Sequence, residues 1–220
     1  MDGGRHESCN GYFFDEGGMS GEYNNNASGN TTTLCSDNGA HIVVDFEYVD
    51  IGRNDFLYIY DGENTSGELL ATLTDLENST AGMYVPFQST DGCLTFEFTS
   101  NGSTKGDGWK AKYQCTTNDP IEFLTLDDNS HHVCEGYFVD DGGLGTNYSG
   151  NQDNTATYCA SPGNFMMIDF SYIQLDLNDH IIIYDGDDTN APKLADIFNM
   201  SAGYGTEEFL PYVSTSECLT

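Results

Sequence analysis

The sequence predicts an all-β fold made of two β-sandwich modules in tandem. The stretch NDFLYIYDG at residues 54–62 occurs again as NDHIIIYDG at residues 178–186, an offset of 124 residues. Strand-like runs recur every 8–12 residues or so between turns rich in Gly, Asn and Asp, and no long stretch has helical period. The cysteines follow the same repeat. These observations indicate two copies of one module of about 110 residues each.

The first module is predicted to begin with a strand that ends in an acidic Gly-Gly turn at residues 9–18, followed by a polar loop over Glu22–Thr33. The next strand, His41–Val49, carries alternating apolar residues, as a half-buried strand does: Ile42, Val44, Phe46 and Tyr48. The remaining predicted strands are Phe56–Tyr60, Glu68–Leu73, Met83–Phe87, Cys93–Thr99 and Gly108–Cys115.

Residues 1–116 form the first predicted module, residues 117–120 a linker, and residues 121–220 the second module. The second module opens with an extra strand-like segment, IEFLTL, and then repeats the first. It contains no counterpart of the first module's FEFTSNGSTKGDGWKAKYQC after Cys218. We therefore expect it to be C-terminally incomplete, with a sheet edge open to a strand from a neighbouring subunit or from the same polypeptide.

The charge of the chain excludes one class of partner. With 36 acidic and 6 basic residues, the formal net charge is −30, so no basic patch is present for a nucleic-acid backbone. The acidic residues serve either as a solvating surface or as ligands for cations, and solvation is expected to account for most of them. No apolar run of about 18 residues indicates a transmembrane helix.

The cysteines predict an extracellular protein with a disulfide framework, because no CxxC or His-spaced pair indicates zinc. They are Cys9, Cys35, Cys93 and Cys115 in the first module and Cys134, Cys159 and Cys218 in the second. Four cysteines allow three pairings, and their order in the sequence favours Cys9–Cys35 and Cys93–Cys115. By the same order Cys134 pairs with Cys159, which leaves Cys218 free or paired across chains. The N-terminus lacks the apolar core of a signal peptide, so Met1 is not expected to be the initiator of the natural precursor.

The order of motifs resembles a CUB domain. In the first module it runs C-x-GYF, an acidic GG turn, C, VDF, D-x-L-x-IYDG, C-L-x-F-x-F and G-W-x-A-x-Y-x-C. The sequence is most similar to the short CUB-like modules of microbial secreted and surface proteins. The resemblance covers nearly the whole chain, and it implies jelly-roll-like β-sandwiches with two disulfides in each complete module.

The resemblance also implies a calcium site, built in many CUB domains from a Glu, the Asp before the IYDG strand and a later Asp. Here the Glu position holds Gly52, near Asp50, and the later Asp is Asn101. The candidate ligands are therefore Asp50, Asp55 and Asn101 in the first module, and Asp176 and Asp179 in the second. The alternative is that Asp55 and Asp179 cap turns by accepting backbone N–H bonds.

Asn-x-Ser/Thr sequons are the next signal. They occur at Asn26, Asn30, Asn64, Asn78, Asn101, Asn147 and Asn199. In an extracellular eukaryotic protein several of them should carry glycans, whereas the alternative is a side effect of polar loop composition. A glycan on Asn101 would conflict with calcium binding there.

No catalytic constellation is present in the sequence, since the histidines lack zinc-enzyme spacing and no P-loop or G-x-S-x-G occurs. We therefore expect a non-catalytic, secreted or cell-surface structural glycoprotein whose modules assemble head-to-tail with neighbouring subunits into a fibre or matrix. The alternative is a calcium-assisted module of a larger protein that binds proteins or glycans.

Overall fold

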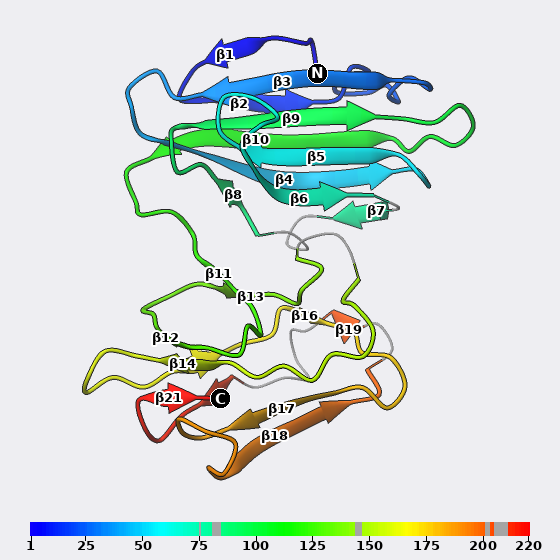
Figure 1. Cartoon of the computed structure of the whole chain (residues 1–220). Coiled ribbons are helices and arrows are strands. Elements are labelled where there is room, and N and C mark those ends of the chain that lie inside the picture. Colours follow the sequence, from blue (N-terminus) through cyan, green and yellow to red (C-terminus); the bar gives the residue numbers. More distant parts are fainter. Residues whose placement is uncertain (75, 81–84, 144–146, 201–202, 205–210) are drawn as a thin grey trace. The chain divides into compact units, whose positions relative to one another are not determined.

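The protein was analysed as a computed structural model that describes residues 1–74, 76–80, 85–143, 147–200, 203–204 and 211–220 (Figure 1). Every regular element among these residues is a β-strand, which confirms the all-β prediction. None of them forms a helix of the length and apolarity that crossing a membrane requires. The chain divides into two compact units, Met1–Glu122 with Val139–Ser149, and Phe123–Phe138 with Gly150–Thr220.

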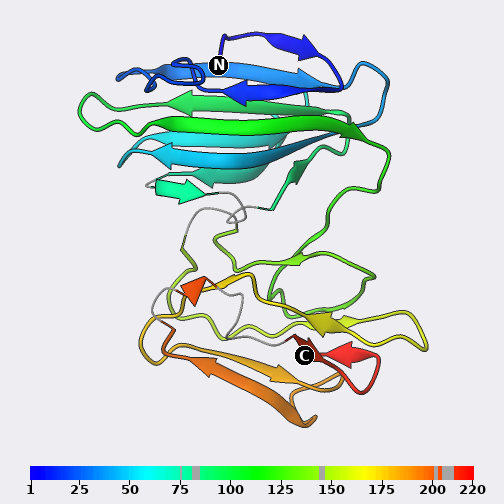
Figure 2. The same ribbon diagram turned by 180° about the vertical axis from the view of Figure 1, so that it is seen from behind.

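The first unit is a sandwich of two sheets, visible from both sides in Figures 1 and 2. One sheet has the order β1-β3-β9-β5-β6, with β1 (Arg5–Glu7), β3 (Ser28–Cys35), β9 (Cys93–Thr99), β5 (Phe56–Asp61) and β6 (Glu68–Leu73). The other has the order β2-β10-β4-β7, with β8 also on β4: β2 (Asn10–Phe14), β10 (Gly108–Thr116), β4 (His41–Ile51), β7 (Leu76–Thr80) and β8 (Phe87–Gln88).

The strands of this unit differ in several details from the sequence-based expectation, among them a strand within a predicted loop and a bulge. The predicted loop over Glu22–Thr33 is wrong at its C-terminal end, because Ser28–Cys35 is a strand between β1 and β9. The polar composition of this segment led to the loop prediction, although its threonines are β-branched and favour strands. Strand β4 also carries a bulge, since the register with β10 shifts between Lys110 and Ala111. One extra residue reverses the alternation, so Val49 is buried and Tyr48 is not.

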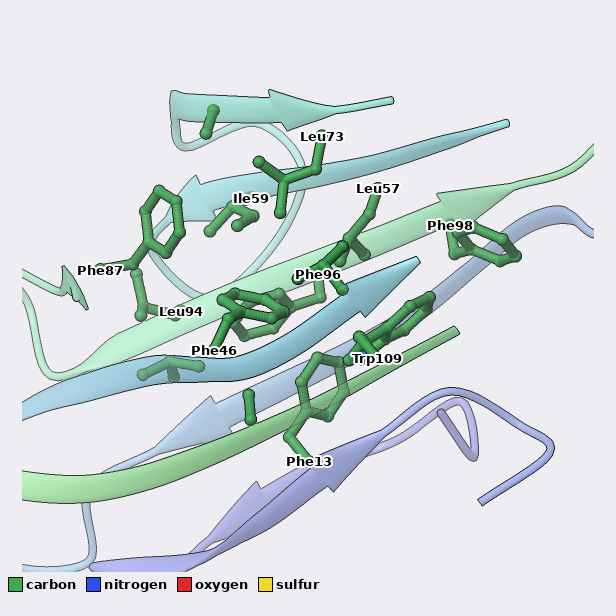
Figure 3. Packing of buried hydrophobic residues seen from close by; sticks show 14 of the residues in the cluster. Phe13, Phe46, Leu57, Ile59, Leu73, Phe87, Leu94, Phe96, Phe98 and Trp109 are labelled. Atoms are coloured by element: carbon green, nitrogen blue, oxygen red, sulfur yellow. The ribbon is translucent and has the colours of Figure 1, made fainter. Parts of the chain in front are cut away.

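The core of the first unit lies between its two sheets. Figure 3 shows aromatic rings from both sheets in one cluster. The Trp109 ring lies 5.8 Å from that of Phe13 and 5.1 Å from that of Phe98, centroid to centroid, and Phe13 lies 4.5 Å from Phe96. Such pairs stabilise beyond the area that they bury, by about 0.5–1.5 kcal/mol each.

The disulfides of the first unit correct the predicted pairing. Cys9 is bonded to Cys115 and Cys35 to Cys93, not Cys9 to Cys35 and Cys93 to Cys115. The reason is sheet order: β2 pairs with β10 and β3 pairs with β9, which places each cysteine beside a partner far away in sequence. Each bond therefore links neighbouring strands of one sheet.

The second unit repeats this framework with shorter strands. Its strands are β11 (Phe123–Leu124), β12 (Ser130–His132), β13 (Tyr137–Phe138), β14 (Thr157–Cys159), β15 (Met167–Ile168), β16 (Tyr172–Ile173), β17 (His180–Tyr184), β18 (Lys193–Phe198), β19 (Gly203–Tyr204), β20 (Tyr212–Val213) and β21 (Cys218–Leu219). β12 runs parallel to β14 as β1 runs parallel to β3. The register shift between Ile183 and Tyr184 recurs 124 residues after the one between Ile59 and Tyr60.

The cysteines of the second unit also differ from the prediction. Cys159 is bonded to Cys218, the counterpart of Cys35–Cys93, and Cys134 is free and exposed. Cys218 is therefore neither free nor available for a bond between chains.

Few large side chains are buried in the second unit. Its buried apolar residues are Val133, Ala156, Cys159, Ala160, Ile173, Leu175, Ile183, Ile197 and Leu219, with no aromatic residue among those described. Exposed ones include Phe165 (63%), Met167 (59%) and Phe198 (48%). Among the described residues, this half of the chain has no core comparable to that of the first unit.

Candidate functional site

Two regions carry the candidate functional residues: a cluster of loops at one end of the first unit, and the edge of β17 in the second. In the first, Asp55 closes the turn before β5. Its N–H donates to the Gly52 carbonyl at 3.1 Å, and Asn54 adopts φ of 61°. Asp55 is fully buried, yet each carboxylate oxygen has a donor: the Asn101 N–H at 2.7 Å and the Tyr23 hydroxyl at 2.6 Å. A buried carboxylate requires such donors.

The Tyr23 hydroxyl is the centre of this cluster. It accepts hydrogen bonds from the backbone N–H of Gly52 at 2.8 Å and of Gly106 at 2.9 Å. Because both amides can only donate, the hydroxyl proton is left for Asp55. Burial, and then the hydrogen bond to Asp55, raise the pKa of Tyr23 well above its usual value, so the hydroxyl keeps its proton.

Glycine is required at the two positions that donate to Tyr23. A β-carbon at position 52 would lie 2.9 Å from the Thr104 carbonyl oxygen and 3.0 Å from the Tyr23 hydroxyl oxygen. At position 106 it would lie 2.1 Å from the Asp50 carbonyl oxygen. Side chains at either position would displace the loops from the hydroxyl.

Asn101 closes the cluster from the loop after β9. Its side-chain oxygen accepts from the N–H groups of Ser103 and Thr104 at 2.7 and 3.2 Å, and from the Ser103 hydroxyl at 2.9 Å. Its side-chain nitrogen donates to the Arg53 carbonyl at 2.6 Å. Both ends of the amide are therefore engaged in holding the loop.

Asp50 lies toward the surface of the same end. Its Oδ2 accepts from the Asp107 N–H at 3.1 Å and from the Tyr48 hydroxyl at 3.2 Å, and the Asp107 carboxylate lies 3.4 Å from that hydroxyl. Partial burial, then the charges of Asp50 and Asp107, raise the pKa of Tyr48 to about 12. This negative surface sits beside Tyr48 because the bulge in β4 turns that residue outward.

The residues of the first unit fit calcium poorly in this geometry. Calcium takes six to eight oxygen ligands, whereas protein donors already occupy both oxygens of Asp55 and the side-chain oxygen of Asn101. The position of the family glutamate is Gly52, which has no room for a side chain. Among the described residues, only one set of three or more His, Cys, Asp or Glu side chains lies as close together as metal ligands do. It consists of Cys9, Asp37 and Cys115, and both cysteines are in a disulfide.

The second unit treats the corresponding residues differently. The Asp179 N–H donates to the Asp176 carbonyl at 3.1 Å, as Asp55 does to Gly52, but Asp179 and Asp176 are exposed. Here a carboxylate stands at the position that is glycine in the first unit.

The aspartate of each YDG motif has a role that sequence reasoning missed. Asp61 accepts from the Thr90 N–H at 2.9 Å and from its hydroxyl at 2.6 Å. Asp185 does the same for Thr215, at 2.7 and 2.6 Å. The motif is therefore repeated because its aspartate ties β5 or β17 to the loop before the next cysteine. The Asp-Gly pair alone indicated only a turn.

The edge of β17 is the second candidate region. In the first unit, β5 lies between β6 and β9, and β9 also pairs with β3. In the second unit, β21 begins the same strand: Leu219 bridges Asp185, and Thr220 exchanges two backbone hydrogen bonds with Tyr184, at 2.6 and 3.1 Å. Over His180–Ile183, β17 pairs with β18 alone among the described residues.

The sequons fall in different environments. Asn64 is exposed in a turn where its side chain accepts from the Ser66 N–H, and Asn26, Asn30, Asn147 and Asn199 are also exposed. Asn101 donates its side-chain nitrogen, the atom that a glycan would modify, to Arg53. The side chain of Asn78 lies outside the described part of the chain.

No model of a known protein family matches the chain, and no curated protein matches it. Solved structures are similar to it. The full extracellular region of zebrafish Gpr126/Adgrg6 is 15% identical with a TM-score of 0.41, over 50% of this chain and only 14% of that one. The MASP-1 CUB2 domain bound to Ca²⁺ is 16% identical with a TM-score of 0.40, over 52% of this chain and 100% of that one. The CUB1-EGF-CUB2 domain of human MASP-1/3 is 16% identical with a TM-score of 0.43, over 96% and 92%. The latter two are named as CUB domains, the family whose motifs this sequence resembles.

Proposed function

We propose that the chain is a non-catalytic extracellular structural protein whose CUB-like modules assemble head-to-tail into a fibre or matrix. The observation that carries the proposal is the open edge of β17. An extended strand from a neighbouring subunit would continue β21 there, in the position that β9 occupies in the first unit. Strand addition of this kind satisfies backbone groups and buries alternate side chains.

The register of the first unit defines the chemistry of the added strand. Ile59 pairs with Phe96 and Leu57 with Phe98 in β5–β9, and all four side chains are fully buried. Their counterparts on β17 are Ile183 and Ile181. The added strand therefore carries large apolar residues at alternate positions. Burying each of these side chains would stabilise the complex by about 1.5–3 kcal/mol.

Head-to-tail contacts of this type propagate, because a heterologous interface that does not close into a ring extends as a filament. Three disulfides support an extracellular location, where such bonds persist. Glycans on exposed sequons such as Asn64 and Asn147 would add a solubilising surface.

Electron microscopy and sedimentation over a range of concentrations test the assembly. Filaments or concentration-dependent oligomers are expected, and excess peptide FEFTSN (residues 96–101) should dissociate them by filling the edge of β17. A control peptide with both phenylalanines replaced by serine should not. A single-chain particle at every concentration, also for a chain extended past Thr220, would overturn the proposal and place the missing strand in the same polypeptide.

The second candidate function, calcium-assisted binding of a protein or glycan, is favoured by one observation in the second unit. Asp176 and Asp179 present two exposed carboxylates on one turn. Titration calorimetry measures calcium binding by the wild-type chain and by the Asp176→Asn and Asp179→Asn variants. Binding by the wild type that both substitutions abolish would support this function. Unchanged binding in both variants would exclude these residues.

A further inference from the structure

We infer that the first unit holds its loop cluster with the Tyr23 hydroxyl in place of a divalent cation, so that any partner bound at this end is bound without calcium. The cluster consists of Tyr23, Asp55, Gly52, Gly106 and Asn101 in the first unit, whereas the assembly proposed above involves the second unit.

Protein donors stabilise the charge of Asp55. Asp55 is fully buried, and a buried carboxylate needs strong compensation. Its two donors, the Tyr23 hydroxyl at 2.6 Å and the Asn101 N–H at 2.7 Å, make short hydrogen bonds to the charged group. Bonds of this kind are about twice as strong as neutral ones. The negative charge is therefore stabilised by protein donors, one on each oxygen.

The Tyr23 hydroxyl also connects the loops that a cation would connect. A cation at this position would join the turn after β4 to the loop after β9 by ligating oxygens from both. The Tyr23 hydroxyl already joins them, since Gly52 lies in the turn and Gly106 in the loop. One hydroxyl has one proton and two acceptor sites, and all three are used here. Its bonds to Gly52 and Gly106 reach segments that lie 29 and 83 residues after Tyr23 in the sequence.

The cluster leaves little space for an acidic side chain at position 52. The family glutamate position is Gly52, and a β-carbon there would lie 3.0 Å from the Tyr23 hydroxyl oxygen. A side chain at position 52 would therefore displace the Thr104 carbonyl and the Tyr23 hydroxyl from their present positions. In the second unit the corresponding residue is Asp176.

Trp109 makes a unit-specific test possible, because it is the only tryptophan of the chain and is buried in the first unit. Thermal unfolding of the full chain is followed by Trp109 fluorescence, in EDTA and in about 5 mM Ca²⁺. We expect the same midpoint in both solutions. We expect Tyr23→Phe to lower the midpoint by more than about 4 °C, equally in both, because it leaves buried groups on three segments without a partner.

Tyr60→Phe is the matched control. It removes a tyrosine hydroxyl from the same unit, but one that makes a single half-exposed bond to Glu97 at 3.2 Å. Its effect should be much smaller. A calcium-induced rise of the wild-type midpoint would overturn the inference, because a ligand that binds only the folded state raises its stability. This outcome can be read even if Tyr23→Phe does not fold. Equal effects of the two tyrosine variants would also contradict it.

Discussion

At the scale of single residues, Tyr48 shows how a local irregularity creates a chemical environment. Strict alternation along β4 would place it in the core, but the bulge turns it toward Asp50 and Asp107. Its hydroxyl can donate to only one of the two carboxylates at a time, so the other adds negative charge. This environment favours the neutral tyrosine and resists its ionisation.

The stability of the first unit should therefore fall at alkaline pH. The pKa of Tyr48 is about 12 in the folded chain, against 10.0 for an ordinary tyrosine. As the pH rises, the unfolded chain loses this proton first, so the contribution is complete below about pH 10 and is lost between about pH 10 and 12. Urea unfolding followed by Trp109 fluorescence measures this.

Tyr48→Phe should make that decline shallower. The pKa values of Tyr23 and Tyr60 are also raised, by burial and by their carboxylate partners, so part of the decline should remain in the variant. Identical slopes for wild type and Tyr48→Phe between about pH 10 and 12 would contradict the assignment.

At the scale of elements, the disulfides act between neighbouring strands. Cys35–Cys93 joins β3 to β9, and Cys9–Cys115 joins the start of β2 to the end of β10. Both close long loops, because the bonded cysteines are separated by 58 and 106 positions in the sequence. In the chain-entropy model, longer loops restrict the unfolded chain more.

Replacing both Cys35 and Cys93 by serine should lower the free energy of unfolding of the first unit by about 4 kcal/mol. Cys134→Ser, which removes a free exposed thiol, should change it by less than about 0.5 kcal/mol. Urea titration measures both. Peptide mapping without reduction should recover Cys9 with Cys115, and a peptide joining Cys9 to Cys35 would contradict the structure.

At the scale of the whole molecule, the two units are unequally completed. The first has a continuous core that includes three buried aromatic residues from β9 and β10: Phe96, Phe98 and Trp109. In the second, β21 reaches only the end of β17, which over His180–Ile183 pairs with β18 alone among the described residues, and several large apolar side chains are exposed. Local stability depends on buried contacts and on hydrogen bonds protected from solvent.

Hydrogen exchange should therefore separate the two copies of the repeated strand. In the isolated chain, peptides covering Phe56–Asp61 should be far better protected than peptides covering His180–Tyr184, because β5 is bonded on both edges. Addition of the peptide FEFTSN should slow exchange in His180–Tyr184 and leave Phe56–Asp61 unchanged. Equal protection of the two strands before addition would argue against an open edge.

The sequence by itself determined the local features of this protein. Alternation and turn residues predicted Glu68–Leu73 and Cys93–Thr99 with their observed bounds, because strand periodicity is a property of neighbouring residues. The 124-residue repeat predicted that β17 would copy β5, including the turn before it. Strand β3 was not predicted, because its polar threonines and asparagine are also typical of a loop.

Only the tertiary structure decided which distant residues meet. The cysteine spacing allowed three pairings, and the order of strands in the sheets selected one that joins β3 to β9 and β2 to β10. Tyr23 lies 32 residues before Asp55, and nothing in the local pattern connects them. Whether Asp55 binds a cation or accepts hydrogen bonds from protein donors depends on which residues lie across from it in space. Sequence periodicity carries no information about that, because neighbours across a sheet are set by long-range strand pairing.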